Sequence, residues 1–238
     1  MGRAFELRKG RKMKRWAAMS KTFTRIGKDI VMAIKEGGSD PETNSKLRAV
    51  IQNAKTANMP KDNIERAIKK ASDKDTSNYK EALFEGYANH GIAILIETAT
   101  DNNNRTVANI RSYFNKCDGS LATSGSVDFL FDHLCFFQIK DEGIDIEELE
   151  LELIDFGVIE LSKSENEISI TARFEDFGSI QKELERRKLE ISSSELEREA
   201  KINKALPQDE RLKVERLINM IDEDEDVQNV YHDMKTID

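Results

Sequence analysis

The segment Ile92-Ala93-Ile94-Leu95-Ile96-Glu97-Thr98 decides the fold class of this 238-residue chain. Five consecutive apolar residues followed by Glu and Thr predict a strand that is buried on both faces of a sheet. A shorter strand is predicted over residues 83–87, and the turn Asn89-His90-Gly91 separates the two. Helical periodicity on both sides of this strand pair then indicates an α+β fold.

Apolar residues recur every three or four positions before the sheet. The stripe that predicts a first helix, from about residue 16 to 36, consists of Trp16, Met19, Phe23, Ile26, Ile30 and Ala33. Gly37-Gly38 is expected to end it. Asp40 as N-cap and Pro41 at the first helical position predict a second helix, and Pro60 is expected to begin a third. We therefore predict a basic helical domain of three helices over residues 1–78.

Another helix is predicted after the cap signal at residues 100–104, with Val107, Ile110, Phe114 and Cys117 on its inner face. A strand is expected at residues 127–131. From residue 134 to about 196 the predicted order is strand, helix, strand, strand, helix, strand, which is the order of a ferredoxin-like unit. Its first and last strands are expected at residues 135–140 and 189–193.

The last predicted strand, Val227 to Tyr231, follows a helix and has no other sheet near it in the sequence. We expect it to complete the middle domain. This arrangement predicts a discontinuous α+β middle domain, residues 79–133 plus 207–238, and an inserted ferredoxin-like α+β domain, residues 134–206.

Charge divides the chain into a basic beginning and an acidic remainder. Residues 1–70 contain 18 Lys and Arg against 7 Asp and Glu, a net charge of +11, and the remaining residues carry −19. Between Arg3 and Arg15 lie seven basic residues and one acid, Glu6. Long-range electrostatic fields of this kind orient the basic end of a protein toward a polyanion.

Basic residues that neutralise phosphates are therefore the candidate nucleic-acid contacts. They are Arg3, Arg8, Lys9, Arg11, Lys12, Lys14, Arg15, Lys21, Arg25, Lys28, Lys46, Arg48, Lys55, Lys61, Arg66, Lys69, Lys70 and Arg105. Asn63, Arg66 and Lys69, spaced three apart, suggest a base-reading set. Trp16 could stack on a base, although its spacing favours a place in the apolar stripe. The competing hypothesis is a solvated basic tail with no partner.

Motifs for catalysis and metal binding are absent from the sequence. It contains no Walker loop, no dinucleotide-binding glycine pattern and no nucleophile elbow, and we predict no enzyme activity. Cys117, His133 and Cys135 lack metal-ligand spacing, and the acidic run 222–226 is expected to solvate a helix end. We therefore predict no metal and no cofactor.

The number of cysteines and the lengths of the apolar runs predict the localisation. Two cysteines favour a reducing compartment, and no apolar run approaches the length of a signal or membrane segment. A basic transit peptide is the weaker alternative. We predict a cytoplasmic protein that does not contact a membrane.

Several segments together carry a family resemblance. They are residues 37–44 with Leu47-Arg48, residues 54–70, Phe84-Glu85-Gly86-Tyr87, residues 100–102 with 104–106, and residues 226–232. In these segments the sequence resembles the YebC/PmpR family of probable transcriptional regulators, which is related to the mitochondrial translational activator of cytochrome oxidase subunit I. The chain departs from the His-Ser-Lys-Trp type of start that many members have, since it begins Gly2-Arg3-Ala4-Phe5.

The resemblance implies a non-enzymatic α+β protein with a helical N-terminal domain, a discontinuous middle domain and an inserted third domain around a cleft. It also implies a DNA-binding transcriptional regulator, in which the basic helices bind phosphates of duplex DNA. The alternative is a translational activator that binds ribosomal RNA or tRNA on the ribosome. A weaker alternative is an adaptor that holds a protein partner through its acidic domains.

Overall fold

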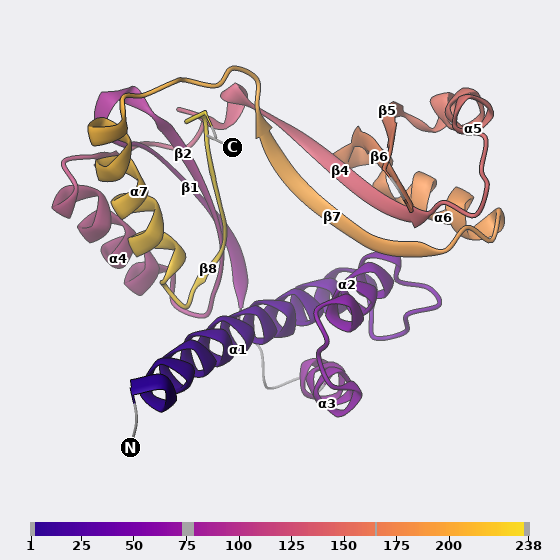
Figure 1. The fold of residues 1–238 in the computed structure, drawn as a ribbon, viewed down its shortest axis with the longest axis horizontal. Helices are drawn as coiled ribbons and strands as arrows, with labels where there is room; N and C mark the ends of the chain where they lie inside the picture. The colour runs from indigo at the N-terminus through magenta and orange to yellow at the C-terminus, as the bar shows by residue number, and fades with distance from the viewer. Residues whose placement is uncertain (1–2, 73–78, 165, 236–238) are drawn as a thin grey trace. The chain divides into compact units, whose positions relative to one another are not determined.

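The computed structural model describes residues 3–72, 79–164 and 166–235, with side chains described from residue 19 onward. Its chain divides into two compact units, Met1–Ser77 and Asn78–Asp238 (Figure 1). The described part of the first unit consists of three helices and their connections, and the second unit contains two antiparallel sheets of four strands each. The predicted α+β class is confirmed.

The first unit consists of α1 (Arg3–Gly37), α2 (Ser45–Thr56) and α3 (Lys61–Ser72). Its core is built from the apolar stripe of α1 and the inner faces of the other two helices; the buried members are Ile26, Ile30, Ala33, Ile34, Leu47, Ala54, Met59 and Ile64. Met19 belongs to the predicted stripe but is 40% exposed, so the stripe enters the core only from Phe23.

Two helix boundaries differ from the predictions. Helix α1 begins at Arg3 rather than near Trp16, because Arg, Lys, Leu, Ala and Met all favour helix even where no apolar stripe is present. Helix α2 begins at Ser45, and its N-cap is Asn44, whose Oδ1 accepts the Leu47 N–H at 3.0 Å. Asp40 instead caps a turn, since its Oδ1 accepts the Glu42 N–H at 3.0 Å.

The buried Asn44 side chain also joins α1 to the connection before α2. Its Nδ2 donates to Ala33 O at 2.7 Å and to Gly38 O at 2.8 Å. A Cβ at Gly37 would lie 2.7 Å from Asn44 Cγ, which explains why glycine occupies the end of α1. Gly38, with φ of 85°, takes the left-handed conformation expected at a helix end.

The first sheet of the second unit has the order β3-β1-β2-β8. Its strands are β1 (Lys80–Tyr87), β2 (Ala93–Thr100), β3 (Ser120–Leu121) and β8 (Val227–His232), and the short helix η1 (Asn89–Gly91) joins β1 to β2. Helices α4 (Asn103–Lys116) and α7 (Gln208–Asp222) pack on one face (Figure 1). Strand β2 is buried on both faces, as predicted, and it pairs with β8.

The second sheet has the order β5-β6-β4-β7, and the chain passes through it as β4-α5-β5-β6-α6-β7, the predicted ferredoxin-like order. Its elements are β4 (Phe131–Lys140), α5 (Ile146–Leu153), η3 (Ile154–Phe156), β5 (Val158–Lys163), β6 (Glu167–Arg173), η4 (Phe174–Asp176), α6 (Phe177–Arg186) and β7 (Ile191–Ala200). The predicted boundary at residues 133/134 lies within β4.

Two strand predictions in this region are wrong. Strand β7 extends to Ala200, not Ser193, because its polar residues pair with β4 as far as Phe131. Residues 128–130 form the short helix η2 (Asp128–Leu130), not a strand. The buried Glu85 carboxylate accepts the N–H groups of Gly125, Val127 and Asp128 at 2.6, 2.6 and 3.0 Å, so this backbone curls around it.

Candidate nucleic-acid interface

Eight predicted contacts lie on the first half of α1. The helix backbone places them on one continuous helix from Arg3, and their side chains are outside the described residues. They are Arg3, Arg8, Lys9, Arg11, Lys12, Lys14, Arg15 and Trp16. This backbone geometry differs from that of a disordered tail, because the spacing along a helix is fixed at 1.5 Å per residue.

The remaining candidates on α1 are partly or fully buried. Lys21 and Arg25 are half-buried, and each takes part in a polar interaction. Lys28 is 7% exposed, which differs from the prediction of an exposed basic face. Val31, three residues later, is also buried.

The candidates on α2 have different local surroundings. Lys46 Nζ lies 2.9 Å from Glu36 Oε1. Arg48 Nη1 donates to Pro41 O at 2.5 Å and to Glu42 O at 3.1 Å, so Arg48 holds the connection between α1 and α2. Lys55, in the last turn of α2, is exposed and has no ion pair within the described part of the chain.

Helix α3 buries Ile64 and exposes several charged side chains. Lys61 Nζ lies 3.5 Å from Glu65 Oε1, and Lys69 and Lys70 are exposed. Arg66 Nη2 donates to Asn63 Oδ1 at 2.5 Å, and Arg66 Nε donates to Asp62 O at 3.1 Å. Two of the three residues of the predicted base-reading set, Asn63 and Arg66, are therefore hydrogen-bonded to each other.

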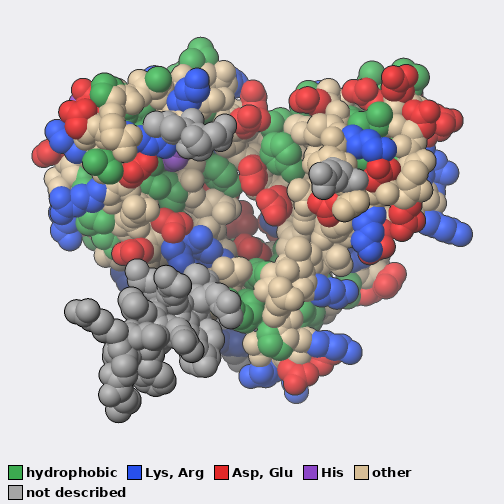
Figure 2. All heavy atoms as spheres, in the orientation of Figure 1, with side chains coloured by type: hydrophobic (Ala, Val, Ile, Leu, Met, Phe, Trp, Pro, Cys, Tyr) green, Lys and Arg blue, Asp and Glu red, His purple; other side chains and the backbone are tan. Residues whose placement is uncertain are grey.

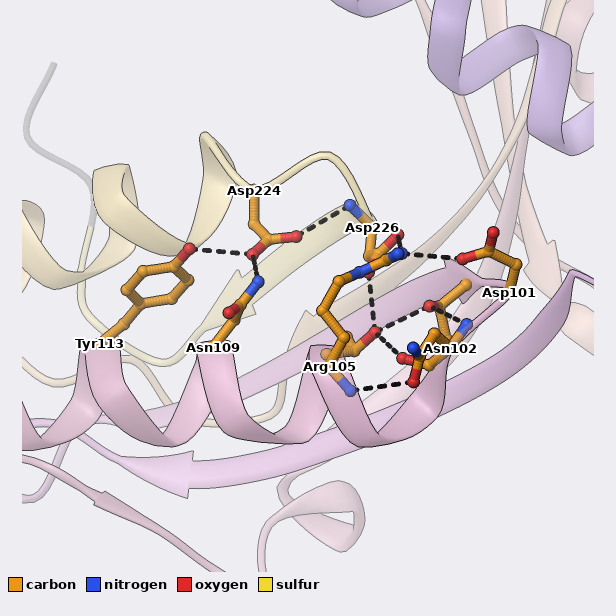
Figure 3. Close-up of polar contacts among 9 residues, drawn as sticks. Asp101, Asn102, Arg105, Asn109, Tyr113, Asp224 and Asp226 are labelled. Carbon is orange, nitrogen blue, oxygen red and sulfur yellow. Dashed lines mark hydrogen bonds and ion pairs between the residues drawn. The ribbon is translucent and has the colours of Figure 1, made fainter.

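Arg105 belongs to the second unit, at the beginning of α4. Its Nη2 lies 2.8 Å from Asp226 Oδ1 and 2.8 Å from Asp101 Oδ1, and its Nε donates to Asp226 Oδ2 at 3.2 Å (Figure 3). Hydrogen bonds to Asp226 and then to Asp101 raise the pKa of Arg105 above its ordinary value. Arg105 thus ties the beginning of α4 to the beginning of β8.

Asp226, the buried acid that holds Arg105, forms part of a wider hydrogen-bond network with Asp224 (Figure 3). Asp226, 4% exposed, also accepts the Thr106 hydroxyl at 2.8 Å. Asp224 accepts Asn109 Nδ2 at 3.0 Å and the Tyr113 hydroxyl at 2.9 Å. Burial, followed by the hydrogen bond to Asp224, raises the pKa of Tyr113 to about 12.

This network was missed by sequence reasoning. The prediction that the acidic run 222–226 solvates a helix end is wrong for Asp224 and Asp226, since both are buried. The network joins two of the segments that carry the family resemblance, residues 100–106 and 226–232. Cap residues such as Asn102, whose Oδ1 accepts the Arg105 N–H at 3.1 Å, are readable locally, but the pairing across 121 residues is not.

The cysteine and histidine residues form no metal centre. Cys117 and Cys135 are free and buried, and burial raises the pKa of Cys135 to about 12. The His133 ring stacks on Phe174 with centroids 3.7 Å apart. Among the described residues, no group of three or more His, Cys, Asp or Glu is placed to hold a metal ion.

Comparisons with known proteins cover nearly the whole chain. The family model described as "TACO1/YebC protein N-terminal domain" matches residues 3–74, and the one described as "TACO1/YebC second and third domain" matches residues 79–234. In the described part of the chain, no helix is long and apolar enough to cross a membrane.

Curated relatives and a solved structure match at similar coverage. A "Probable transcriptional regulatory protein" of Flavobacterium johnsoniae is 70% identical over 235 residues, 99% of each chain. One of the same name from Porphyromonas gingivalis is 57% identical, over 99% of this chain and 98% of its own. The crystal structure of a conserved hypothetical protein from Aquifex aeolicus matches with a TM-score of 0.75 and 32% identity, over 91% of this chain and 90% of its own.

Proposed function

This chain belongs to the TACO1/YebC family, and we propose that it is a non-enzymatic regulatory protein that binds nucleic acid through the phosphate backbone, with duplex DNA as its target. The observation that carries the proposal is the continuous helix α1, whose first 13 residues contain seven Lys and Arg. The names of the relatives, probable transcriptional regulatory proteins, support a role in transcription.

A preformed helix makes these cations effective phosphate ligands. Helix α1 has 35 residues and is about 52 Å long. Duplex DNA carries one negative charge per about 1.7 Å of its axis, so a basic helix of this length can neutralise several phosphates at once. Because the helix is already formed, binding would not require ordering of its backbone.

The proposed contacts are the basic residues of α1 from Arg3 to Arg15, together with Lys55 and Lys69. Lys28 is left out because it is buried, and Arg48 and Arg105 are left out because backbone carbonyls and carboxylates hold them. Contacts of this kind fix a protein on the nucleic acid without reading its sequence.

The internally bonded Asn63 and Arg66 favour a second candidate, a translational activator that binds structured RNA. Direct reading of bases by α3 would require the 2.5 Å bond between these side chains to break. Ribosomal RNA and tRNA are recognised by shape and backbone charge, for which α3 needs no free base-reading side chains.

A salt titration of the full-length protein tests the shared chemistry. Binding to a 30-base-pair duplex and to tRNA would be measured by fluorescence anisotropy between 50 and 200 mM salt. The triple variant Arg11→Gln/Lys12→Gln/Arg15→Gln should flatten the slope of log affinity against log salt by about 2 to 3. The matched control Lys182→Gln/Lys188→Gln/Lys213→Gln removes the same charge from exposed positions of the second unit and should leave the slope unchanged.

The same titration distinguishes the two targets. Tighter binding to duplex DNA supports the transcriptional role, whereas tighter binding to tRNA, with co-sedimentation on ribosomes that RNase abolishes, supports the translational one. A slope near zero for the wild type, or equal effects of the two triple variants, would contradict both.

A further inference from the structure

The outer side of α5 and η3 carries two exposed apolar side chains. Leu151 is 72% exposed and Ile154 is 58% exposed. The backbone remains helical through Ile154, with φ of −60° and ψ of −37°, so residues three apart share one side of the helix. The opposite side is the one that packs in the core, through Leu149 and Leu153. Stability of the fold therefore does not explain the apolar character of the outer side.

Acidic residues surround this apolar pair. Residues 141–162 contain nine Asp and Glu and no Lys, Arg or His. Glu147, Glu148, Glu150 and Asp155 are exposed and have no ion pair among the described residues. The part of the surface that contains α5 shows acidic side chains beside hydrophobic ones (Figure 2).

Three other acids of the same segment, Asp141, Asp145 and Glu152, have structural partners. Asp145 caps α5 by accepting the N–H groups of Glu147 and Glu148 at 3.0 and 3.2 Å. Glu152 pairs with Arg187, and Asp141 Oδ2 lies 2.6 Å from Lys163 Nζ. Glu147, Glu148, Glu150 and Asp155 thus differ from Glu152, because no ion pair joins them to another described residue.

We infer that the outer side of α5 and η3 is a docking surface for a basic segment of a partner protein that carries apolar anchors. The surface consists of Leu151, Ile154, Glu147, Glu148, Glu150 and Asp155. Like charge excludes a nucleic acid as its ligand, and the acids steer a cationic segment toward the surface. Leu151 and Ile154 are spaced to contact apolar side chains three or four apart on a basic helix.

The neighbouring edge strand argues for side-chain docking rather than strand addition. Strand β5 lies at the edge of the second sheet. Its register shifts between Val158 and Glu160, which pair with Ala172 and Thr171, so the intervening Ile159 is an extra residue of a β-bulge. A bulge disturbs the ladder that an added strand would need. Ile159 is 56% exposed and adds apolar surface next to η3 in the chain.

A defined peptide pair tests the inference on the full-length protein. The probe is a 14-residue peptide of Lys and Leu with its Leu residues on one helical face, and the control peptide has Ser in place of every Leu. Isothermal titration calorimetry should show that the Leu-containing peptide binds the wild type about tenfold more tightly than it binds Leu151→Ser/Ile154→Ser. Amide shifts in NMR spectra should map to residues 147–155.

The matched control variant is Ile202→Ser/Leu212→Ser, which removes two apolar side chains that are 77% and 56% exposed elsewhere in the same unit. It should bind the probe as the wild type does. Because all four side chains are exposed, thermal melting should be unchanged in both variants, and nucleic-acid binding should be unchanged as well. The latter readout separates this inference from the proposed function.

Several outcomes would overturn the inference. Equal binding of the two peptides would reduce the surface to non-specific charge attraction. Equal affinities of the wild type and Leu151→Ser/Ile154→Ser, or shifts that map to other elements, would place the site elsewhere. Self-association of the wild type that Leu151→Ser/Ile154→Ser abolishes would assign the surface to a second copy of this chain.

Discussion

Lys69 and Arg105 are both exposed cations on helices, yet their surroundings differ. Arg105 lies between the carboxylates of Asp101 and Asp226, whereas Lys69 on α3 has no carboxylate partner in the described residues. Arg198 repeats the pattern of Arg105, since it contacts Glu97 at 3.0 Å and Asp128 at 2.6 Å. Arg105 and Arg198 of the acidic unit thus stabilise the fold, and a count of charges alone does not identify the cations that remain for a ligand.

The largest expected effect concerns a buried acid of the second unit. Glu85→Gln should lower the free energy of unfolding by about 3 kcal/mol at pH 7, because a neutral amide replaces the carboxylate that accepts three backbone N–H groups. Urea unfolding followed by near-ultraviolet circular dichroism measures the loss. Glu223→Gln, at an exposed position, is the control and should change stability by less than about 0.5 kcal/mol.

The difference in stability between the wild type and Glu85→Gln should depend on pH. Burial raises the pKa of Glu85, but the N–H groups of Val127, Gly125 and Asp128 together outweigh burial and hold it below the ordinary 4.5. The stabilisation by the carboxylate is therefore complete above pH 4.5 and is lost as the pH falls through the folded-state pKa. A difference between wild type and Glu85→Gln that stays constant down to pH 3 would contradict this account.

A smaller effect is expected for the acid that holds Arg105. Asp226→Ala should destabilise the protein by about 2 kcal/mol, because Thr106 and the Arg105 guanidinium lose a buried acceptor. Asp101→Ala removes the other carboxylate from the same arginine at a 51% exposed position and should have almost no effect on the melting temperature. Neither variant should change nucleic-acid affinity. If Asp226→Ala is fully folded and still binds nucleic acid more weakly, Arg105 has a role in binding.

The smallest expected effect on stability belongs to the basic unit. Lys55→Gln/Lys69→Gln should leave the melting temperature unchanged, since neither side chain has a described ion pair. In nucleic-acid binding, the same variant should reduce the slope of log affinity against log salt by about one for each residue replaced. An unchanged slope with a lowered melting temperature would mean that Lys55 and Lys69 stabilise the fold and do not bind nucleic acid.

The sequence predicts the elements that are decided by local apolar periodicity. The core stripe of α1 from Phe23, the buried strand β2 and the order of the second sheet are all readable in this way. An apolar strand near the end of the chain also needs a sheet to join, but that its partner is β2 is seen only in the structure.

Features set by tertiary contacts were not predictable. Asp40 and Asn44 are both good caps, and only the packing of Asn44 against Ala33 and Gly38 decides between them. The helix η2 forms where a strand was predicted because Glu85, about 40 residues earlier in the chain, binds its backbone. The same applies to the candidate site, where the burial of Lys28 and the pairing of Arg105 with Asp226 have no local signal.

The pairing of β4 with β7 has a consequence for how the chain could be shortened. The two strands pair from Phe131 with Ala200 to Ile139 with Ile191, so the chain enters and leaves the second sheet through neighbouring residues. Directly opposed residues of antiparallel strands have Cα atoms about 5 Å apart, a distance that a two-residue turn can close. We therefore expect the second sheet to be removable: a tight turn placed across β4 and β7 should leave the ends of the first sheet where they are.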